Sequence, residues 1–160
     1  MPNNLKPLAV GTKAPDFTLK NEHAEDFKLS EHRGKRVLLS FHPLAYTGVC
    51  SKQAKSLEAK KKAFDSLNTV AVGISVDSHQ AKEAWAKELG IKNTHMLSDF
   101  WPHGGVAKKY GVFREEDGLT QRSNFIVDEK GKIVFAKVYD MDEFPDIDEV
   151  INMLKTLESK

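Results

Sequence analysis

The sequence predicts an α/β fold with a mixed central sheet, helices on both of its faces and a pair of strands added at the N-terminus. Two observations support this prediction. Mostly apolar runs suited to buried strands occupy residues 37–41 and 69–76, and a segment with helical spacing of apolar residues follows each run. Further along, two strand-like segments flank a loop that contains Gly131, and an amphipathic segment follows them, which indicates a hairpin and a final helix.

Each element is expected from its own pattern. Short strands at 16–19 and 27–29 are joined by a polar segment, and the run 37–41 ends before Pro43, which lacks the amide hydrogen that a sheet ladder needs. The next expected helices are 51–67 and a segment with the apolar residues Ala81, Ala84, Trp85 and Leu89, closed by Gly90. The remaining expected elements are a strand at 95–97, a helix at 106–110, strands at 124–127 and 132–137, and a helix over 147–154. This order is the one that the thioredoxin-like fold uses.

Length and composition limit the classes of protein and partner. The 160 residues fit a single domain spanning 1–160. The net charge of +1 provides no electrostatic reason for binding nucleic acid or an anionic membrane. Neither a signal peptide nor a membrane-spanning run is recognisable, so a cytoplasmic location is expected. The six histidines lack metal-ligand spacing and the single cysteine cannot form an internal disulfide, so neither a metal site nor a disulfide scaffold is expected.

The segment 41–53 is the one that indicates chemistry. It leaves a buried strand, passes through a loop with Pro43 and Gly48, and enters a helix. If Thr47 is the N-cap, Cys50 is the third helical residue. The Thr47 hydroxyl would then accept a hydrogen bond from a backbone N–H at that position. The free N–H groups and the positive end of the helix dipole then favour the thiolate, which is the nucleophilic form of cysteine. Cys50 is therefore the candidate catalytic residue.

The spacing Pro43-x-x-x-Thr47-x-x-Cys50 resembles the active-site motif of the peroxiredoxins. The similarity extends over nearly the whole chain, and Arg122 stands where that family has its active-site arginine. The segments that carry the further similarity are 11–17, 74–77, 97–99 and 110–112. Segments 41–50 and 98–104 look closest to the one-cysteine, AhpE-like subgroup.

This resemblance implies a thiol-dependent peroxidase, an antioxidant oxidoreductase that reduces hydrogen peroxide and organic hydroperoxides through a sulfenic acid at Cys50, its redox-active centre. Thr47 and the backbone N–H of Cys50 would bind the peroxide. Arg122 would stabilise the thiolate and the charge that develops on the oxygens, and Pro43 would pack over the pocket. No cofactor is implied, and a homodimer is the assembly expected by resemblance.

Two residues beside the motif are candidates for supporting roles. Gln53 occupies a position that is often Glu in the family; its amide can still orient Arg122 by hydrogen bonding, but it supplies no negative charge. For His42, a structural role is preferred over proton transfer. Position 55, where some peroxiredoxins have a second cysteine, is Lys55. The thiol that resolves the sulfenic acid is therefore expected from outside, as a small thiol, a thioredoxin-like or glutaredoxin-like protein, or a second copy of the chain.

Two other functions compete with this reading. A thiol–disulfide oxidoreductase needs Cys-x-x-Cys, and Gln53 occupies the position of the second cysteine. A non-catalytic redox sensor or holdase would use the fold alone. The presence of Thr47 and Arg122 favours an enzyme, because a binding scaffold does not need hydrogen-bond donors directed at a peroxide.

Overall fold

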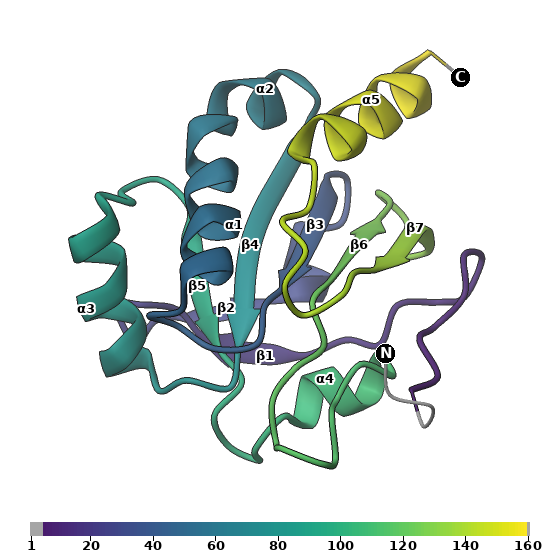
Figure 1. Ribbon diagram of the computed structural model, residues 1–160. Helices are drawn as coiled ribbons and strands as arrows, with labels where there is room; N and C mark the ends of the chain where they lie inside the picture. The colour runs from purple at the N-terminus through teal and green to yellow at the C-terminus, as the bar shows by residue number, and fades with distance from the viewer. Residues whose placement is uncertain (1–4, 160) are drawn as a thin grey trace.

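The computed structural model describes residues 5–159. Its strands form one seven-stranded sheet in the order β2-β1-β5-β4-β3-β6-β7 (Figure 1). The strands are β1 Thr18–Lys20, β2 Asp26–Lys28, β3 Arg36–Phe41, β4 Thr69–Ser75, β5 His95–Ser98, β6 Ser123–Val127 and β7 Ile133–Val138. Strand β3 pairs in parallel with β4 and antiparallel with β6, which confirms a mixed sheet.

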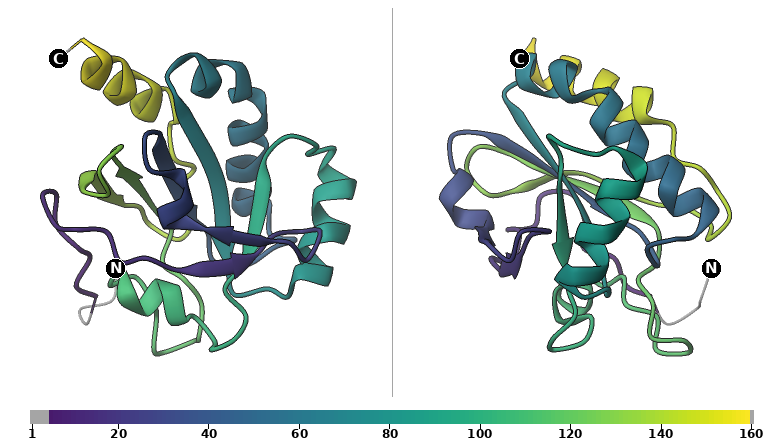
Figure 2. Two further views of the ribbon diagram at one scale, coloured as in Figure 1. Left: turned by 180° about the vertical axis from the view of Figure 1, so that it is seen from behind. Right: turned by 90° about the vertical axis from the view of Figure 1, so that its left-hand side faces the viewer.

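Both faces of the sheet are covered, because the side chains of β3 alternate between two apolar clusters. Val37 and Phe41 pack in one cluster with α4 and the N-terminal segment, whereas Leu38 packs in the other with residues of α1, α2, α3 and α5. The helices are α1 Gly48–Ala59, α2 Lys61–Ser66, α3 His79–Leu89, α4 Gly105–Lys109 and α5 Ile147–Glu158, with a short 3₁₀ helix, η1, at Leu29–His32. Figure 2 shows η1 on the side of the sheet away from α1 and α5. The predicted helices on both faces are confirmed.

The N-terminal strands extend one edge of the sheet. β1 and β2 pair with each other antiparallel, and β1 joins β5 through the single pair Lys20–Ser98. The predicted strand 27–29 ends one residue early, because Leu29 begins η1 and buries its side chain. At the other edge, the predicted hairpin is present: Gly131 has φ +92°, and Asp128 Oδ1 accepts the N–H groups of Lys130 and Lys132.

The helix expected over 51–67 is instead two helices. Lys60 has ψ 15°, so it leaves the helical conformation between α1 and α2. The change in direction lets Leu57 from α1 and Phe64 from α2 pack in the same apolar cluster. The apolar spacing persists across Lys60 and therefore predicts a continuous helix. Such local spacing does not reveal a bend that is imposed by packing.

The buried face of α3 also differs from the expected one. Ala84 is exposed, and the buried residues are Lys82, Trp85 and Ala86. The helix begins after Ser78, whose hydroxyl accepts the N–H of Ala81 at 3.2 Å. A lysine therefore occupies a core position on this helix.

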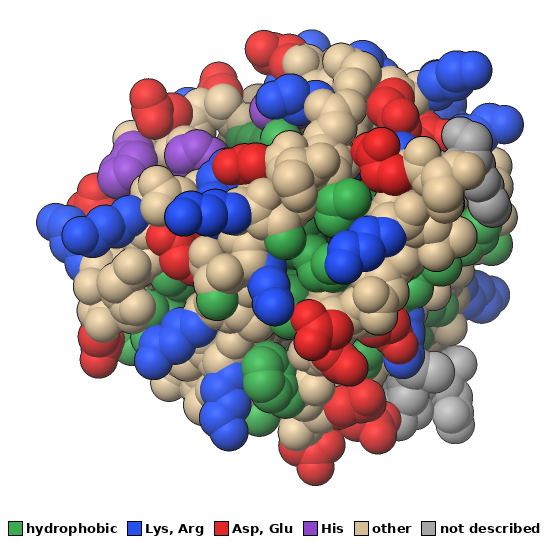
Figure 3. All heavy atoms as spheres, turned by 90° about the horizontal axis from the view of Figure 1, so that it is seen from above, with side chains coloured by type: hydrophobic (Ala, Val, Ile, Leu, Met, Phe, Trp, Pro, Cys, Tyr) green, Lys and Arg blue, Asp and Glu red, His purple; other side chains and the backbone are tan. Residues whose placement is uncertain are grey.

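The surface mixes charges of both signs. On the face drawn in Figure 3, basic and acidic side chains are interspersed. None of the helices between residues 5 and 159 has the length and apolar character that a bilayer span requires.

Candidate active site

The loop between β3 and α1 is fixed to the end of β4. His42 donates its N–H to the carbonyl of Ile74 at 2.9 Å, and Ala45 donates its N–H to Asp77 Oδ2 at 2.8 Å. The same carboxylate oxygen accepts the hydroxyl of Ser75 at 2.5 Å. Sequence reasoning gave Asp77 no role in the site, although this residue follows a buried strand, a position from which polar side chains commonly build sites in α/β proteins.

Cys50 is the third residue of α1, and Thr47 is the N-cap, as predicted. The expected capping bond is wrong, because the Thr47 hydroxyl donates to the carbonyl of Leu44 at 2.9 Å and no side chain caps the helix. The first bond at this end of α1 is the one that Ser51 donates to the carbonyl of Thr47 at 2.9 Å. The N–H of Cys50 precedes it and has no acceptor within the helix.

Arg122 directs its guanidinium at the cysteine. Nη1 lies 3.4 Å from Cys50 Sγ and 2.7 Å from Gln53 Oε1, and Nη2 donates to the carbonyl of Met141 at 2.7 Å. Arg122 and Cys50 are both buried. The sequence analysis did not identify Met141, because the residue type does not indicate which backbone carbonyl in a loop accepts a hydrogen bond.

Gln53 connects the arginine to the sheet. While its Oε1 accepts from Arg122, its Nε2 donates to Ser40 Oγ at 2.7 Å and to the carbonyl of Phe41 at 3.0 Å. The amide thus uses its acceptor and its donor at once, which a carboxylate cannot do. This geometry explains why an amide fits at a position where the similar family often has Glu.

A hollow of about 320 Å³ opens above these residues. Pro43, Thr47 and Arg122 line it together with the apolar side chains of Leu44, Val49, Leu119 and Met141. Cys50 is not among the lining residues and its exposed fraction is 0%. The sulfur therefore lies beneath the hollow, within reach of Arg122 and shielded from bulk water.

His42 does not join this group. Its Nε2 lies 2.7 Å from Lys82 Nζ, and both side chains are buried. Sequence reasoning missed Lys82. A signal was present, because Lys82, Trp85, Ala86 and Leu89 recur at i, i+3, i+4 and i+7, the spacing of one buried helix face.

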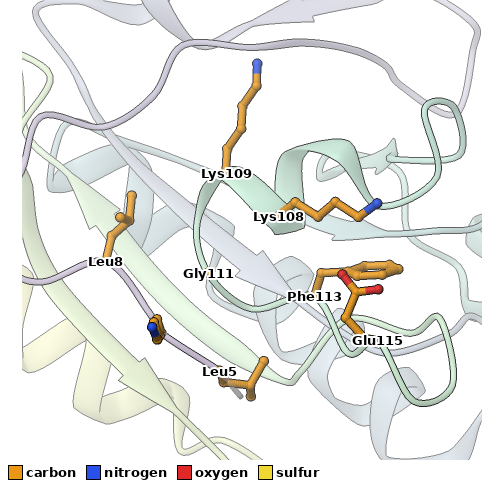
Figure 4. A pocket seen from close by; sticks show the side chains of 8 residues that line it. Leu5, Leu8, Lys108, Lys109, Gly111, Phe113 and Glu115 are labelled. Atoms are coloured by element: carbon orange, nitrogen blue, oxygen red, sulfur yellow. The ribbon is translucent and has the colours of Figure 1, made fainter.

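A second hollow, of about 430 Å³, lies apart from Cys50, between the N-terminal segment and α4 (Figure 4). Leu5, Leu8, Lys108, Phe113 and Glu115 are among the residues that line it. No cysteine or histidine is among the residues that line it.

A thioredoxin-like fold with a buried cysteine at a helix N-terminus, held against an arginine, defines the class of thiol-dependent peroxidases. The comparison with known proteins agrees, because residues 10–136 match the model of the AhpC/TSA family. The chain therefore belongs to the AhpC/TSA family, which includes the peroxiredoxins, and it is a peroxidase.

Individual relatives support this assignment. The chain is 42% identical over 132 residues to alkyl hydroperoxide reductase E of Mycobacterium tuberculosis, covering 82% of this chain and 86% of the relative. It is 32% identical over 159 residues to peroxiredoxin-1 of Gallus gallus, covering 93% and 79%. Among solved structures, the reduced 2-Cys peroxiredoxin of Plasmodium vivax superposes with a TM-score of 0.86 at 27% identity, covering 96% of this chain and 83% of the other. AhpC of Enterococcus faecalis also gives a TM-score of 0.86, at 25% identity, covering 93% and 92%. The predicted thioredoxin-like fold and the resemblance to the one-cysteine AhpE-like subgroup are confirmed.

Proposed function

We propose that this chain, acting as a single domain over residues 1–160, reduces hydrogen peroxide and organic hydroperoxides with Cys50 as nucleophile. The observation that carries the proposal is the 3.4 Å distance between Arg122 Nη1 and Cys50 Sγ inside a buried site. A guanidinium at that distance stabilises a thiolate, and it can also bind an oxygen on which negative charge develops.

In the proposed reaction, the Cys50 thiolate attacks the terminal peroxide oxygen in line with the O–O bond. An S–O bond forms, the O–O bond breaks, and its electron pair leaves on the second oxygen. That oxygen takes up a proton and departs as water or an alcohol, and Cys50 remains as a sulfenic acid. The sulfur is oxidised and the peroxide is reduced, so the step balances without a cofactor.

Thr47 and the backbone N–H of Cys50 hold the peroxide in this proposal. Because the Thr47 hydroxyl donates its hydrogen to the carbonyl of Leu44, its oxygen lone pairs are available to accept the O–H of a hydroperoxide. The free N–H of Cys50 donates to a peroxide oxygen. Pro43 lines the hollow above the sulfur and limits the entry of water.

Gln53 and His42 have supporting roles. Gln53 orients Arg122 through the 2.7 Å bond to Oε1. His42 has a structural role beside the site, through its hydrogen bond to Lys82.

An external thiol completes the cycle. Cys50 is the only cysteine in the sequence, and position 55 is Lys55. Two thiols from a small molecule, or a thioredoxin-like or glutaredoxin-like dithiol, reduce the sulfenic acid to the thiol and release water and a disulfide. Without such a reductant, excess peroxide carries Cys50 on to the sulfinic state.

We further propose that the protein is a cytoplasmic homodimer. A reducing compartment suits a lone peroxidatic cysteine and an external thiol donor. Trp101 has an exposed fraction of 81%, and Phe100 beside it is also exposed, so together they offer apolar surface to a second copy.

The deciding experiment adds one equivalent of peroxide to the reduced protein and follows the intact mass. The proposal expects a rapid gain of one oxygen, no gain in Cys50→Ser, and sustained turnover when a thiol is supplied. Slow oxidation without turnover would favour the redox sensor instead.

A further inference from the structure

Lys82 is buried without a carboxylate partner. Its exposed fraction is 0%, and it lies on α3 beside the buried residues Trp85 and Ala86. None of the ion pairs formed within residues 5–159 includes Lys82. Burial of an ammonium ion without a paired carboxylate is strongly unfavourable, and a methionine of similar length would fill the same space. Packing alone therefore does not account for a lysine at this position.

His42 holds the Lys82 side chain in place. Nζ lies 2.7 Å from His42 Nε2 and 5.2 Å from the centroid of the Trp85 ring. The centroids of the His42 and Trp85 rings are 5.2 Å apart, so Trp85 contacts both Lys82 and His42. Gly73 leaves room for Met96 and for the imidazole, because a Cβ there would lie 2.9 Å from Met96 Sδ and 3.3 Å from His42 Cε1.

The neutral state of the His42 ring makes its Nε2 a hydrogen-bond acceptor. Burial, together with the charges of Lys82 and Arg122, holds the pKa of His42 well below 6.5. The imidazole is therefore neutral at pH 7, and its Nε2 accepts a hydrogen bond from the ammonium. The pair carries one positive charge when Lys82 is protonated.

His42 and Trp85, the two residues that contact Lys82, both adjoin the peroxidatic site. His42 is bonded directly to Pro43, which lines the hollow above the sulfur. Trp85 donates its indole N–H to Ser51 Oγ at 3.3 Å, and Ser51 follows Cys50 in α1. Cys50 and Trp85 also pack in the same apolar cluster.

Negative groups on three elements favour the ammonium form of Lys82. Burial lowers the pKa of Lys82 to about 7, and the opposing negative charges come from Asp77 after β4, from Cys50 in α1 and from Glu22 between β1 and β2. Asp77 already accepts hydrogen bonds from the N–H of Ala45 and from a serine hydroxyl. The charge at Cys50 is the one among these that changes during the proposed reaction.

We propose that Lys82, held by His42, is a positioning residue whose buried ammonium favours the thiolate of Cys50. The proposal rests on the proposed role of Cys50 as nucleophile. Because a negative sulfur favours a protonated Lys82, a protonated Lys82 must favour a negative sulfur by the same free energy. Arg122 contacts the sulfur directly, and Lys82 acts on it through the field in a site that excludes water.

The test uses the single cysteine as its own reporter. The rate of Cys50 alkylation by iodoacetamide is measured from pH 5 to 10 by intact mass in the wild type, Lys82→Met, His42→Phe and Lys87→Met. Lys87 is the matched control, because it lies on the same helix and is exposed. We expect the midpoint of the profile to rise by about one pH unit in Lys82→Met, to rise by less in His42→Phe, and to stay in place in Lys87→Met.

A purely structural role for Lys82 predicts that Lys82→Met melts at a lower temperature and keeps the wild-type alkylation profile. The proposal instead predicts that the midpoint of the profile rises in folded Lys82→Met, whatever its melting temperature. A profile of folded Lys82→Met that superposes on those of the wild type and Lys87→Met overturns the proposal. If His42→Phe does not fold, Lys82→Met alone decides.

A reciprocal measurement separates this proposal from the proposed function. The titration of Lys82 is followed through its labelled Cε by NMR in the wild type and in Cys50→Ser, and we expect the Lys82 midpoint to fall in the variant. An identical midpoint in both proteins overturns the coupling. Neither measurement uses peroxide, so failure of the peroxidase assay with an intact coupling, or the reverse, identifies which proposal is wrong.

Discussion

Arg122 Nη1 lies 3.4 Å from Cys50 Sγ, although the two residues are 72 positions apart in the sequence. The arginine stands immediately before β6, and the cysteine is in the first turn of α1 after β3. Since β3 and β6 are neighbours in the sheet, their pairing brings the two residues together. The contact is thus a product of strand order, and the proposed function depends on it.

Removal of the Arg122 guanidinium should slow the reaction with peroxide far more than its effect on the ionisation of Cys50 explains. Lowering a thiol pKa from about 8.5 to about 6 raises the thiolate fraction at pH 7 roughly thirtyfold, but intrinsic nucleophilicity falls roughly thirteenfold. We therefore expect Arg122→Ala to lose on the order of 100-fold in peroxide reactivity per thiolate, as for the loss of a donor to a developing oxyanion. Stopped-flow rates, normalised by iodoacetamide alkylation at the same pH, provide the measurement. Equal normalised rates in the wild type and Arg122→Ala would contradict this role of the guanidinium.

Thr47 should matter for rate and little for stability. Its hydroxyl donates to the carbonyl of Leu44 and does not cap α1, so Thr47→Val should destabilise the fold by less than the roughly 1 kcal/mol of a true cap. Loss of the oxygen that holds the peroxide in the proposed reaction should reduce the second-order rate at least about tenfold. Thr47→Ser keeps the hydroxyl and is the control. A large fall in the urea midpoint of Thr47→Val with an unchanged rate contradicts both parts.

Gln53→Glu should destabilise the protein, although Glu is common at this position in the family. The carboxylate can still face Arg122, but it cannot donate to the carbonyl of Phe41, which would then face a negative oxygen. An unsatisfied buried group of this kind costs about 1–3 kcal/mol. Urea unfolding of both proteins at pH 7 checks the value, and an unchanged free energy of unfolding would show that the Nε2 bonds are dispensable.

The pair of Glu22 and His95 should make stability depend on pH. His95 Nδ1 lies 2.8 Å from Glu22 Oε1, and this hydrogen bond raises the pKa of His95 above its ordinary 6.5. The resulting stabilisation is fully present below about pH 6.5 and is lost as the pH rises through the raised value. Burial pushes the pKa of Glu22 upward, but hydrogen bonding, chiefly with His95, outweighs it and leaves this pKa below 4.5, so the carboxyl's contribution is lost on acidification.

We expect the wild type to exceed His95→Gln in stability at pH 5.5 and to lose most of that advantage by pH 9. Since His95 is partly exposed, solvent screening keeps the difference below about 1 kcal/mol. Urea unfolding at the two pH values measures it. A difference that is equal at both would show that the pair does not titrate as described.

Trp101→Glu should dissociate the proposed homodimer. Trp101 is the most exposed large apolar side chain among the described residues, and a buried charge at an interface centre opposes association. Phe144→Glu is the matched control, because Phe144 is another exposed aromatic residue. Sedimentation velocity should show a dimer for the wild type and Phe144→Glu, and a monomer for Trp101→Glu. A monomeric wild type at tens of micromolar contradicts the proposal.

The sequence by itself determined the elements whose signals are local. Apolar runs predicted β3 and β4, helical spacing predicted α5, and the position of Cys50 after Thr47 predicted a cysteine at the start of a helix. These features depend on residues close together in the chain, where propensity and periodicity act directly. The family motif added Arg122, which spacing alone does not relate to Cys50.

Only the tertiary structure decided which distant groups meet. The order of the strands puts Arg122 against Cys50, the carbonyl of Met141 completes its hydrogen bonds, and the packing of α3 on the sheet buries Lys82 against His42. Packing also turned the expected continuous helix at Lys60 and left the Thr47 hydroxyl bonded to a loop carbonyl. Such outcomes depend on contacts between segments far apart in sequence, whose free energies outweigh local preference. Even where helical spacing marks Lys82 as a buried position, it does not show which group the lysine meets.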